Sequence, residues 1–105
     1  MVVVFEQNYL RELFESGHAS DKKHRFQPDI IKRYQKRIEL LMAAPSPDTL
    51  FKFNSLNFEV LTGDKAGRYS IRVNDKYRIE FTLNADLEKP LLTICNIVEL
   101  SNHYD

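Results

Sequence analysis

Hydrophobic residues follow a helical period in the first half of the chain. In QNYLRELFESG (7–17), Leu10, Leu13 and Phe14 have the spacing i, i+3, i+4 that places side chains on one helix face, and Gly17 suits the position just past the helix end. A second apolar stripe lies in QPDIIKRYQKRIELLMAAP (27–45), which has a proline in its first turn and another at its end. That stripe consists of Ile31, Tyr34, Ile38 and Leu41. The pattern therefore predicts two helices.

From Phe58 onward the hydrophobic residues change to a period of two, which is typical of half-buried strands. Four such segments are separated by polar loops: NFEVL, RYSIRV, KYRIEFTL and LLTICNIVEL. Residues 2–5 indicate a short further strand, and SPDTL (46–50) indicates a short helical turn. We therefore expect one α+β domain over residues 1–105, with two N-terminal helices packed on one face of a mainly antiparallel sheet of about four strands.

The two runs in GRYSIRVNDKYRIEF (67–81) predict a hairpin whose register is fixed by its side chains. A two-residue loop would pair Ile71 with Arg78 and mix apolar and charged side chains on one face. A three-residue loop, 74–76, pairs only apolar residues: Val73 with Tyr77, Ile71 with Ile79 and Tyr69 with Phe81. The second register also sets Arg72 directly opposite Arg78, although like charges at opposite positions are destabilising.

Composition narrows the class of protein. A chain of 105 residues with 43% hydrophobic residues is a folded domain rather than a disordered segment. The formal net charge of zero argues against a general nucleic-acid binder but allows a local basic patch. Cys95 is the single cysteine and reads as a buried structural thiol, and the histidines are scattered, so no disulfide, metal or cofactor is expected. No apolar run reaches the length of a membrane helix or has the flanks of a signal peptide, and we expect a cytoplasmic protein.

Charged side chains are expected to gather on the sheet face opposite the helices. Arg72 and Arg78 must lie there because their neighbours fill the other face, and Glu59, between two apolar residues, points the same way. The loop before the hairpin adds Lys65 and Arg68. The alternative is that these arginines are simply solvated and offset by Glu80.

The chain ends in SNHYD, which places His103 and Tyr104 directly after the last strand. Arginine forks fit the geometry of a phosphate, a carboxylate can accept a proton from a ribose 2′-hydroxyl, and an imidazolium can donate one to a leaving oxygen. Clustered cations would stabilise charge that builds on phosphorus. These residue types are the parts needed for phosphodiester chemistry without a metal.

The stretch LTGDKAGRYSIRVNDKYRIEF (61–81), together with the order of strand, two helices and sheet, resembles the RelE/ParE superfamily of bacterial toxins, and most closely its HigB branch. The resemblance covers nearly the whole chain and implies a RelE-like fold. It further implies a toxin of a type II toxin–antitoxin system that cleaves messenger RNA, usually in the ribosomal A site. Such toxins are neutralised in a hetero-oligomer by an antitoxin, which for the HigB branch is a HigA-like helix-turn-helix protein.

The same resemblance implies roles for individual residues. By similarity to the YoeB-like toxins, Glu59 is the general base and His103 the general acid. Arg72 and Arg78 bind the phosphate, and Tyr104 positions the substrate or stacks on a base. Lys65 and Arg68 are expected to contact the RNA backbone, and no metal takes part.

Two alternatives stay open at the level of sequence. ParE-like relatives share the fold but bind DNA gyrase without catalysis, and an inactive relative would act only through its antitoxin. The cations of the second helix, Lys32, Arg33, Lys36 and Arg37, form either a solvated face or a docking surface for the antitoxin.

Overall fold

The structure is a computed structural model, and it describes residues 1–85 and 92–102. Its helices are α1 (Asn8–Glu15) and α2 (Pro28–Ala43), followed by three 3₁₀ turns, η1 (Pro47–Lys52), η2 (Asn54–Leu56) and η3 (Gly63–Lys65). Its strands are β1 (Val2–Phe5), β2 (Glu59–Val60), β3 (Tyr69–Arg72), β4 (Tyr77–Ala85) and β5 (Thr93–Asn102). The predicted α+β class is confirmed, as is the helical turn at residues 46–50.

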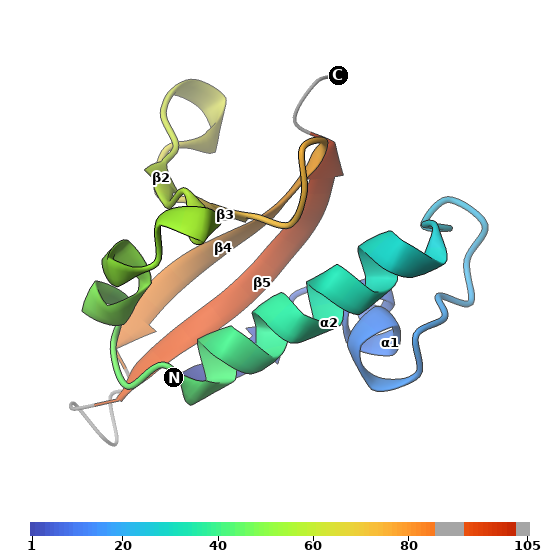
Figure 1. The fold of residues 1–105 in the computed structure, drawn as a ribbon, viewed down its shortest axis with the longest axis horizontal. Helices are drawn as coiled ribbons and strands as arrows, with labels where there is room; N and C mark the ends of the chain where they lie inside the picture. Colours follow the sequence, from blue (N-terminus) through green and yellow to red (C-terminus); the bar gives the residue numbers. More distant parts are fainter. Residues whose placement is uncertain (86–91, 103–105) are drawn as a thin grey trace.

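The sheet has the strand order β1-β5-β4-β3-β2, in which β1 runs parallel to β5 and every other neighbouring pair is antiparallel (Figure 1). Within the described residues it contains five strands, one more than the predicted number of about four. The additional member is the edge strand β1, whose residues 2–5 were predicted to be a strand and which joins the sheet through pairing with residues some ninety positions away in sequence. Local sequence patterns carry no signal for such a distant pairing.

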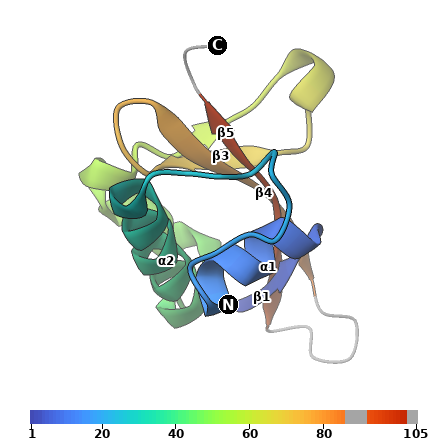
Figure 2. The same ribbon diagram turned by 90° about the vertical axis from the view of Figure 1, so that its right-hand side faces the viewer.

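Both α-helices lie on one side of the sheet, with the axis of α2 roughly aligned with β5 and α1 beside α2 (Figure 1, Figure 2). Helix α2 buries Ile30, Tyr34, Ile38 and Leu41 against the sheet. Ile30 therefore takes the place that the sequence assigned to Ile31, which is only half-buried. The hydroxyl of Tyr34 donates a hydrogen bond of 2.7 Å to the carbonyl of Leu10, so this core side chain also joins the two helices.

The end of α1 has the predicted glycine. Gly17 has a φ of 74°, and its amide donates to the carbonyls of Glu12 and Leu13 at the helix end. In the polar connection that follows, the ring of His24 stacks on Tyr9 with centroids 3.5 Å apart.

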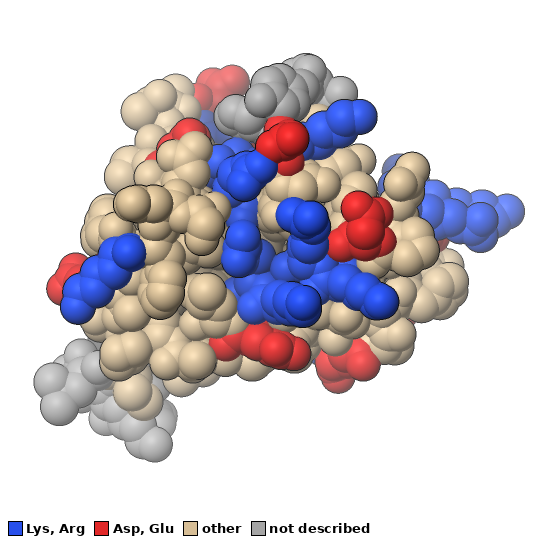
Figure 3. Space-filling view, viewed as in Figure 1, with Lys and Arg blue, Asp and Glu red and all other residues tan. Residues whose placement is uncertain are grey.

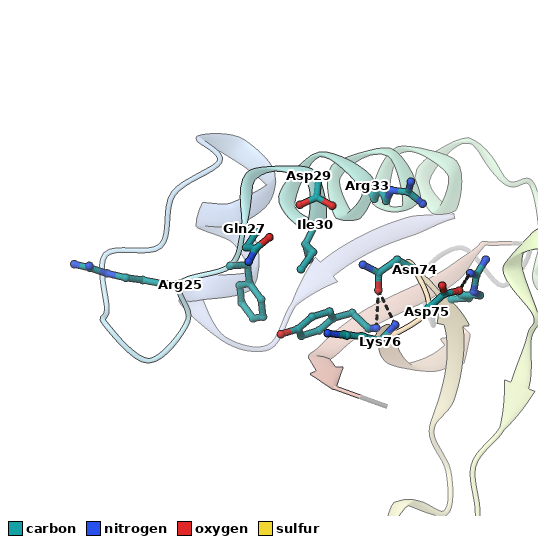
Figure 4. A pocket seen from close by; sticks show the side chains of 11 residues that line it. Arg25, Gln27, Asp29, Ile30, Arg33, Asn74, Asp75 and Lys76 are labelled. Atoms are coloured by element: carbon teal, nitrogen blue, oxygen red, sulfur yellow. Dashed lines mark hydrogen bonds and ion pairs between the residues drawn. The ribbon is translucent and has the colours of Figure 1, made fainter. Parts of the chain in front are cut away.

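The β3–β4 hairpin has the predicted register. Tyr69, Ile71 and Arg72 lie opposite Phe81, Ile79 and Arg78, respectively. In the turn, the side-chain oxygen of Asn74 accepts hydrogen bonds from the amides of Lys76 and Tyr77 (Figure 4). An Asx-type turn of this kind closes the loop and keeps the apolar residues of both strands on the helix side.

A β-bulge interrupts the pairing of β4 with β5. Glu80 lies opposite Glu99, whereas Phe81 lies opposite Ile97, so Val98 is the additional residue in β5. Before the bulge Cys95 and Ile97 face the core, and after it Leu100 does. Burial also raises the pKa of the Cys95 thiol to about 12, which agrees with the expected structural role. Among the described helices, none is long and apolar enough to cross a membrane.

Candidate active site

Arg72 and Arg78 are neighbours across the sheet, but they differ in their surroundings. The side chain of Arg72 is 37% exposed, whereas that of Arg78 is 6% exposed. The sequence placed both arginines on an open surface and outside the core. That prediction was wrong for Arg78, because the η2 turn and the segment that enters β2 cover this end of the sheet.

The guanidinium of Arg78 is fixed by three hydrogen bonds to the protein. Its Nε donates to the hydroxyl of Ser70 at 2.8 Å, and its Nη2 donates to the carbonyls of Ser70 and Asn57. Asn57 has a left-handed backbone with a φ of 43°, which asparagine tolerates better than most residues. A buried arginine with this many fixed partners keeps one orientation.

The carboxylate of Glu59 lies beside this guanidinium, with its Oε2 atom 3.9 Å from Arg78 Nε. Glu59 pairs with Ser70 in the β2–β3 ladder, which brings its side chain to the face opposite the helices as predicted. Burial lowers the pKa of Arg78, the nearby Glu59 raises it, and the charge of Arg72 lowers it again, with a net lowering. The expected neighbourhood of Glu59 and Arg78 is confirmed.

These residues line a hollow of about 260 Å³ on the face opposite the helices. Its walls come from β2, β3, β4 and β5 and include Glu59, Ser70, Arg78, Glu80 and Ser101, with Lys65 from η3 at the edge. Two carboxylates, one guanidinium and one ammonium group therefore meet in this hollow.

Glu80 is buried, with 4% of its surface exposed, and it is paired on two sides. Lys65 Nζ lies 2.7 Å from its Oε2 atom and Arg68 Nη1 lies 3.1 Å from its Oε1 atom. Burial raises the pKa of the Glu80 carboxyl, but hydrogen bonds from Lys65, Ser101 and Arg68 outweigh this and hold the pKa below its ordinary value. Lys65 and Arg68, predicted to contact RNA, thus already face a carboxylate of the same protein.

Arg72 lies between the hollow and the surface of α2. Its guanidinium pairs with Asp75 in the hairpin turn, and its carbonyl accepts a hydrogen bond of 2.9 Å from Arg37 Nε. Burial lowers the pKa of Arg37, and the charges of Arg33 and Arg72 lower it further. These cations belong to the Lys and Arg side chains that gather along α2 and beside the hairpin turn (Figure 3). Positive charge therefore extends from the helix to the sheet.

A larger hollow of about 590 Å³ lies between the start of α2 and the hairpin turn, and Arg72 is part of its wall (Figure 4). Its other charged groups have both signs, with Arg33 and Lys76 near Asp29 and Asp75. It meets the candidate active site only at Arg72, so it widens the cationic surface rather than forming a part of the 260 Å³ hollow.

The candidate acid and its neighbour, His103 and Tyr104, lie outside the described residues. Sequence reasoning missed Ser70 and Asn57, which hold Arg78 in place. Ser70 shares the alternation of Arg72 and could have been assigned to the same face, whereas the contact from Asn57 depends on a turn that no pattern indicates. Within residues 1–85 and 92–102, no group of three or more His, Cys, Asp or Glu side chains could hold a metal ion.

Comparison with known proteins identifies relatives of this chain. Residues 3–91 match the family described as the RelE-like toxin of type II toxin-antitoxin system HigB. Among curated proteins, the chain is 34% identical over 82 residues to Toxin HigB-1 of Vibrio cholerae serotype O1, a match that covers 77% of this chain and 82% of that protein.

Solved structures share the fold at lower sequence identity. The YoeB/ParE toxin from Agrobacterium tumefaciens has a TM-score of 0.62 at 15% identity, over 99% of this chain and all (100%) of that one. A chain of the YoeB-YefM complex from Staphylococcus aureus has a TM-score of 0.55 at 19% identity, over 99% of this chain and 98% of that one. A mutant of YafQ from E. coli has a TM-score of 0.57 at 13% identity, over 96% of this chain and 91% of that one.

Proposed function

The chain belongs to the HigB-like family, the RelE-like toxins of type II toxin–antitoxin systems, and on that premise we propose that it is an endoribonuclease that cleaves messenger RNA without a metal. The observation that carries the proposal is the position of Glu59 beside the buried guanidinium of Arg78, with the two groups 3.9 Å apart in a hollow of about 260 Å³. A fixed cation next to a carboxylate can bind a phosphate while the carboxylate removes a proton from the adjoining ribose.

The reaction begins at the ribose on the 5′ side of the phosphate. Its 2′-oxygen attacks phosphorus while the carboxylate of Glu59 accepts the 2′-hydroxyl proton. The bond from phosphorus to the 5′-oxygen of the next nucleotide breaks, and that oxygen takes a proton from the imidazolium of His103. The products are a 2′,3′-cyclic phosphate and a 5′-hydroxyl, so atoms and charges balance without a water molecule or a metal.

The two arginines have different parts in this mechanism. Arg78 is held by Ser70 and Asn57 before substrate arrives, so its charge needs no rearrangement when negative charge builds on the phosphate. Arg72 is more exposed and paired with Asp75, and it turns from this partner toward the phosphate when RNA binds. Tyr104 positions the substrate or stacks on a base, a role that rests on similarity to the YoeB-like toxins.

The proposed partners are an antitoxin, messenger RNA and the ribosome. Family membership favours a HigA-like antitoxin with a helix-turn-helix fold, in a hetero-oligomer that keeps the toxin inactive, and YoeB is found together with YefM in a related complex. The chain has a formal net charge of zero, so its affinity for RNA depends on the local cations along α2 and the hairpin. We propose that the toxin acts in the cytoplasm and cleaves messages in the ribosomal A site, because the ribosome presents the message to a protein that has no net charge to attract RNA.

Mapping of RNA 5′ ends after induced expression tests the proposal. Expression without antitoxin should arrest growth and create new 5′-hydroxyl ends within coding sequences, and purified toxin should create the same ends on messages bound to ribosomes. Glu59→Gln serves as the matched inactive variant, because Glu59 is half-exposed and its loss leaves the fold intact. Growth arrest by wild type without new RNA ends would reject the nuclease and favour a ParE-like inhibitor of gyrase. Absence of growth arrest would favour an inactive relative.

A further inference from the structure

Glu80 is a buried charge that the proposed reaction does not use. It lies in the central strand β4, two residues from Arg78, and lines the same hollow as Glu59. Its carboxylate is fully engaged, since Lys65, Arg68 and Ser101 all donate to it. A carboxylate with three donors is a poor base, because each hydrogen bond favours the ionised form and opposes the uptake of a proton.

The cations that pair with Glu80 belong to one exposed loop, residues 61–68. The loop bends at Gly63 and Gly67, with φ values of 65° and 92°, and residues 62–67 are exposed. Its base is closed by a hydrogen bond of 2.9 Å from the Leu61 amide to the Arg68 carbonyl. Among the described residues, the ion pairs that tie its side chains to the sheet all end on Glu80 or Glu99. These ion pairs therefore anchor the loop to the sheet.

The two glutamates differ in how they hold the loop. Glu80 is buried and binds both Lys65 and Arg68, whereas Glu99 is 42% exposed and lies 3.6 Å from Arg68 alone. Each carboxylate offsets one positive charge at the edge of the proposed RNA-binding site. If their charge were their only effect, replacing either with glutamine would strengthen RNA binding.

We infer that Glu80 is a positioning residue, which fastens the loop 61–68 to β4 and so holds the Lys65 ammonium at the edge of the hollow, within reach of an RNA phosphate. This inference rests on the proposed ribonuclease function. Lys65 is the group through which Glu80 acts: its ammonium is bound on the sheet side while 45% of its side chain stays exposed at the edge of the hollow. A loose loop would have to be ordered again for every RNA that binds, at a cost in affinity.

Kinetics of RNA cleavage distinguish a positioning role of Glu80 from an effect of its charge. Loss of positioning should lower kcat/KM, whereas loss of one negative charge alone should raise it. Glu80→Gln should lower kcat/KM by about tenfold, mainly through a higher KM, since hydrogen bonds to charged groups are the strong ones. Glu99→Gln is the charge-matched control and should leave kcat/KM unchanged or higher. In a Lys65→Ala background, Glu80→Gln should add less than about twofold, because the group that it positions is gone.

A second measurement needs no RNA. Hydrogen exchange of the amides in residues 61–68 should become faster in Glu80→Gln and stay unchanged in Glu99→Gln. Glu80→Asp, which keeps the charge but reaches less far, should fold and show an intermediate increase. Faster exchange with lower kcat/KM supports the inference. Unchanged exchange, or tighter RNA binding by Glu80→Gln, overturns it while the ribonuclease function stands. If wild-type protein cuts no RNA, the proposed function fails, and the role assigned to Lys65 fails with it.

Discussion

Arg72 lies directly opposite Arg78 across the β3–β4 ladder, yet the two side chains are 37% and 6% exposed. A like-charged pair of this kind persists because the members have separate partners. Asp75 takes the charge of Arg72, whereas Ser70, Asn57 and Glu59 surround Arg78. The pair therefore combines one partly exposed cation, paired with Asp75 at the surface, with one buried cation that the protein holds on several sides.

The two arginines should respond differently to replacement. Arg78→Ala leaves the carbonyl of Asn57 and the hydroxyl of Ser70 without their partner, so the free energy of unfolding should fall by about 2 kcal/mol or more. Arg72→Ala should cost less than about 1 kcal/mol, because its ion pair is at the surface. Both should reduce cleavage by about 10²-fold. Denaturant unfolding next to cleavage assays measures each effect, and equal stability losses would contradict the assigned surroundings.

Glu59→Gln should lower the cleavage rate by about 10²-fold without changing stability by more than about 0.5 kcal/mol. The carboxylate is the proposed base, and its side chain is partly exposed, so glutamine fits the same space. Single-turnover cleavage of a defined RNA gives the rate. A rate near that of wild type would move the role of base to the ribosome or to water.

His103→Ala should abolish cleavage of ordinary RNA if the imidazolium protonates the leaving 5′-oxygen. A substrate with a 5′-bridging sulfur needs no such proton, because a thiolate is a good leaving group. This substrate should therefore restore cleavage by His103→Ala, whereas Glu59→Gln should remain slow. Rescue of both variants, or of neither, would reject the division into one acid and one base.

The ion pairs of Glu80 should make stability depend on pH in the acid range. The pKa of the carboxyl is lowered in the folded protein, so the unfolded chain binds the proton more tightly. The stabilisation is complete above the ordinary glutamate pKa of about 4.3 and is lost as the pH falls through the lower folded value. The difference in unfolding free energy between wild type and Glu80→Gln should thus be constant near neutrality and shrink below about pH 4. Glu39→Gln, on the exposed surface of α2, controls for the loss of one charge.

The exposed cations of α2 are a candidate docking surface for an acidic antitoxin segment. Arg37 is already bonded to the Arg72 carbonyl, so Lys32 and Lys36 are the better probes. Lys32→Glu/Lys36→Glu should weaken antitoxin binding by about tenfold or more, measured by calorimetry at two salt concentrations. Lys22→Glu/Lys23→Glu, in the exposed loop before α2, is the matched control. Equal affinity of both variants would place the antitoxin on another face.

Local pattern was sufficient for the two helices and five strands of the described residues, for the helical turn at residues 46–50 and for the hairpin. The register of Ile71 with Ile79 follows from keeping one face apolar, and the opposition of the two arginines follows from the register. The burial of Arg78 was not predictable in this way. It depends on Asn57 and the η2 turn, which reach the sheet from outside the hairpin and leave no periodic trace in the sequence.

Two further differences have the same origin. Ile30 replaced Ile31 in the core because adjacent isoleucines leave the helical phase open, and only the packing of α2 on the sheet decides between them. Glu80 looked like a surface counter-charge, but the loop 61–68 folds over it and brings two cations into contact. In each case the outcome depends on tertiary contacts, which the local sequence pattern does not contain.

The bulge at Val98 determines where the fold can accommodate a deletion in β5. It shifts the inward positions of β5 from odd to even numbers, so Ile97 and Leu100 both reach the core although three positions separate them. Loss of Val98 would remove the bulge and restore strict alternation, so Leu100 would still face the core and Glu99 and Ser101 would still face away from it. Loss of a residue of β5 away from the bulge would instead turn one part of the strand to the opposite face, so the bulge is the place where this strand best accommodates a deletion.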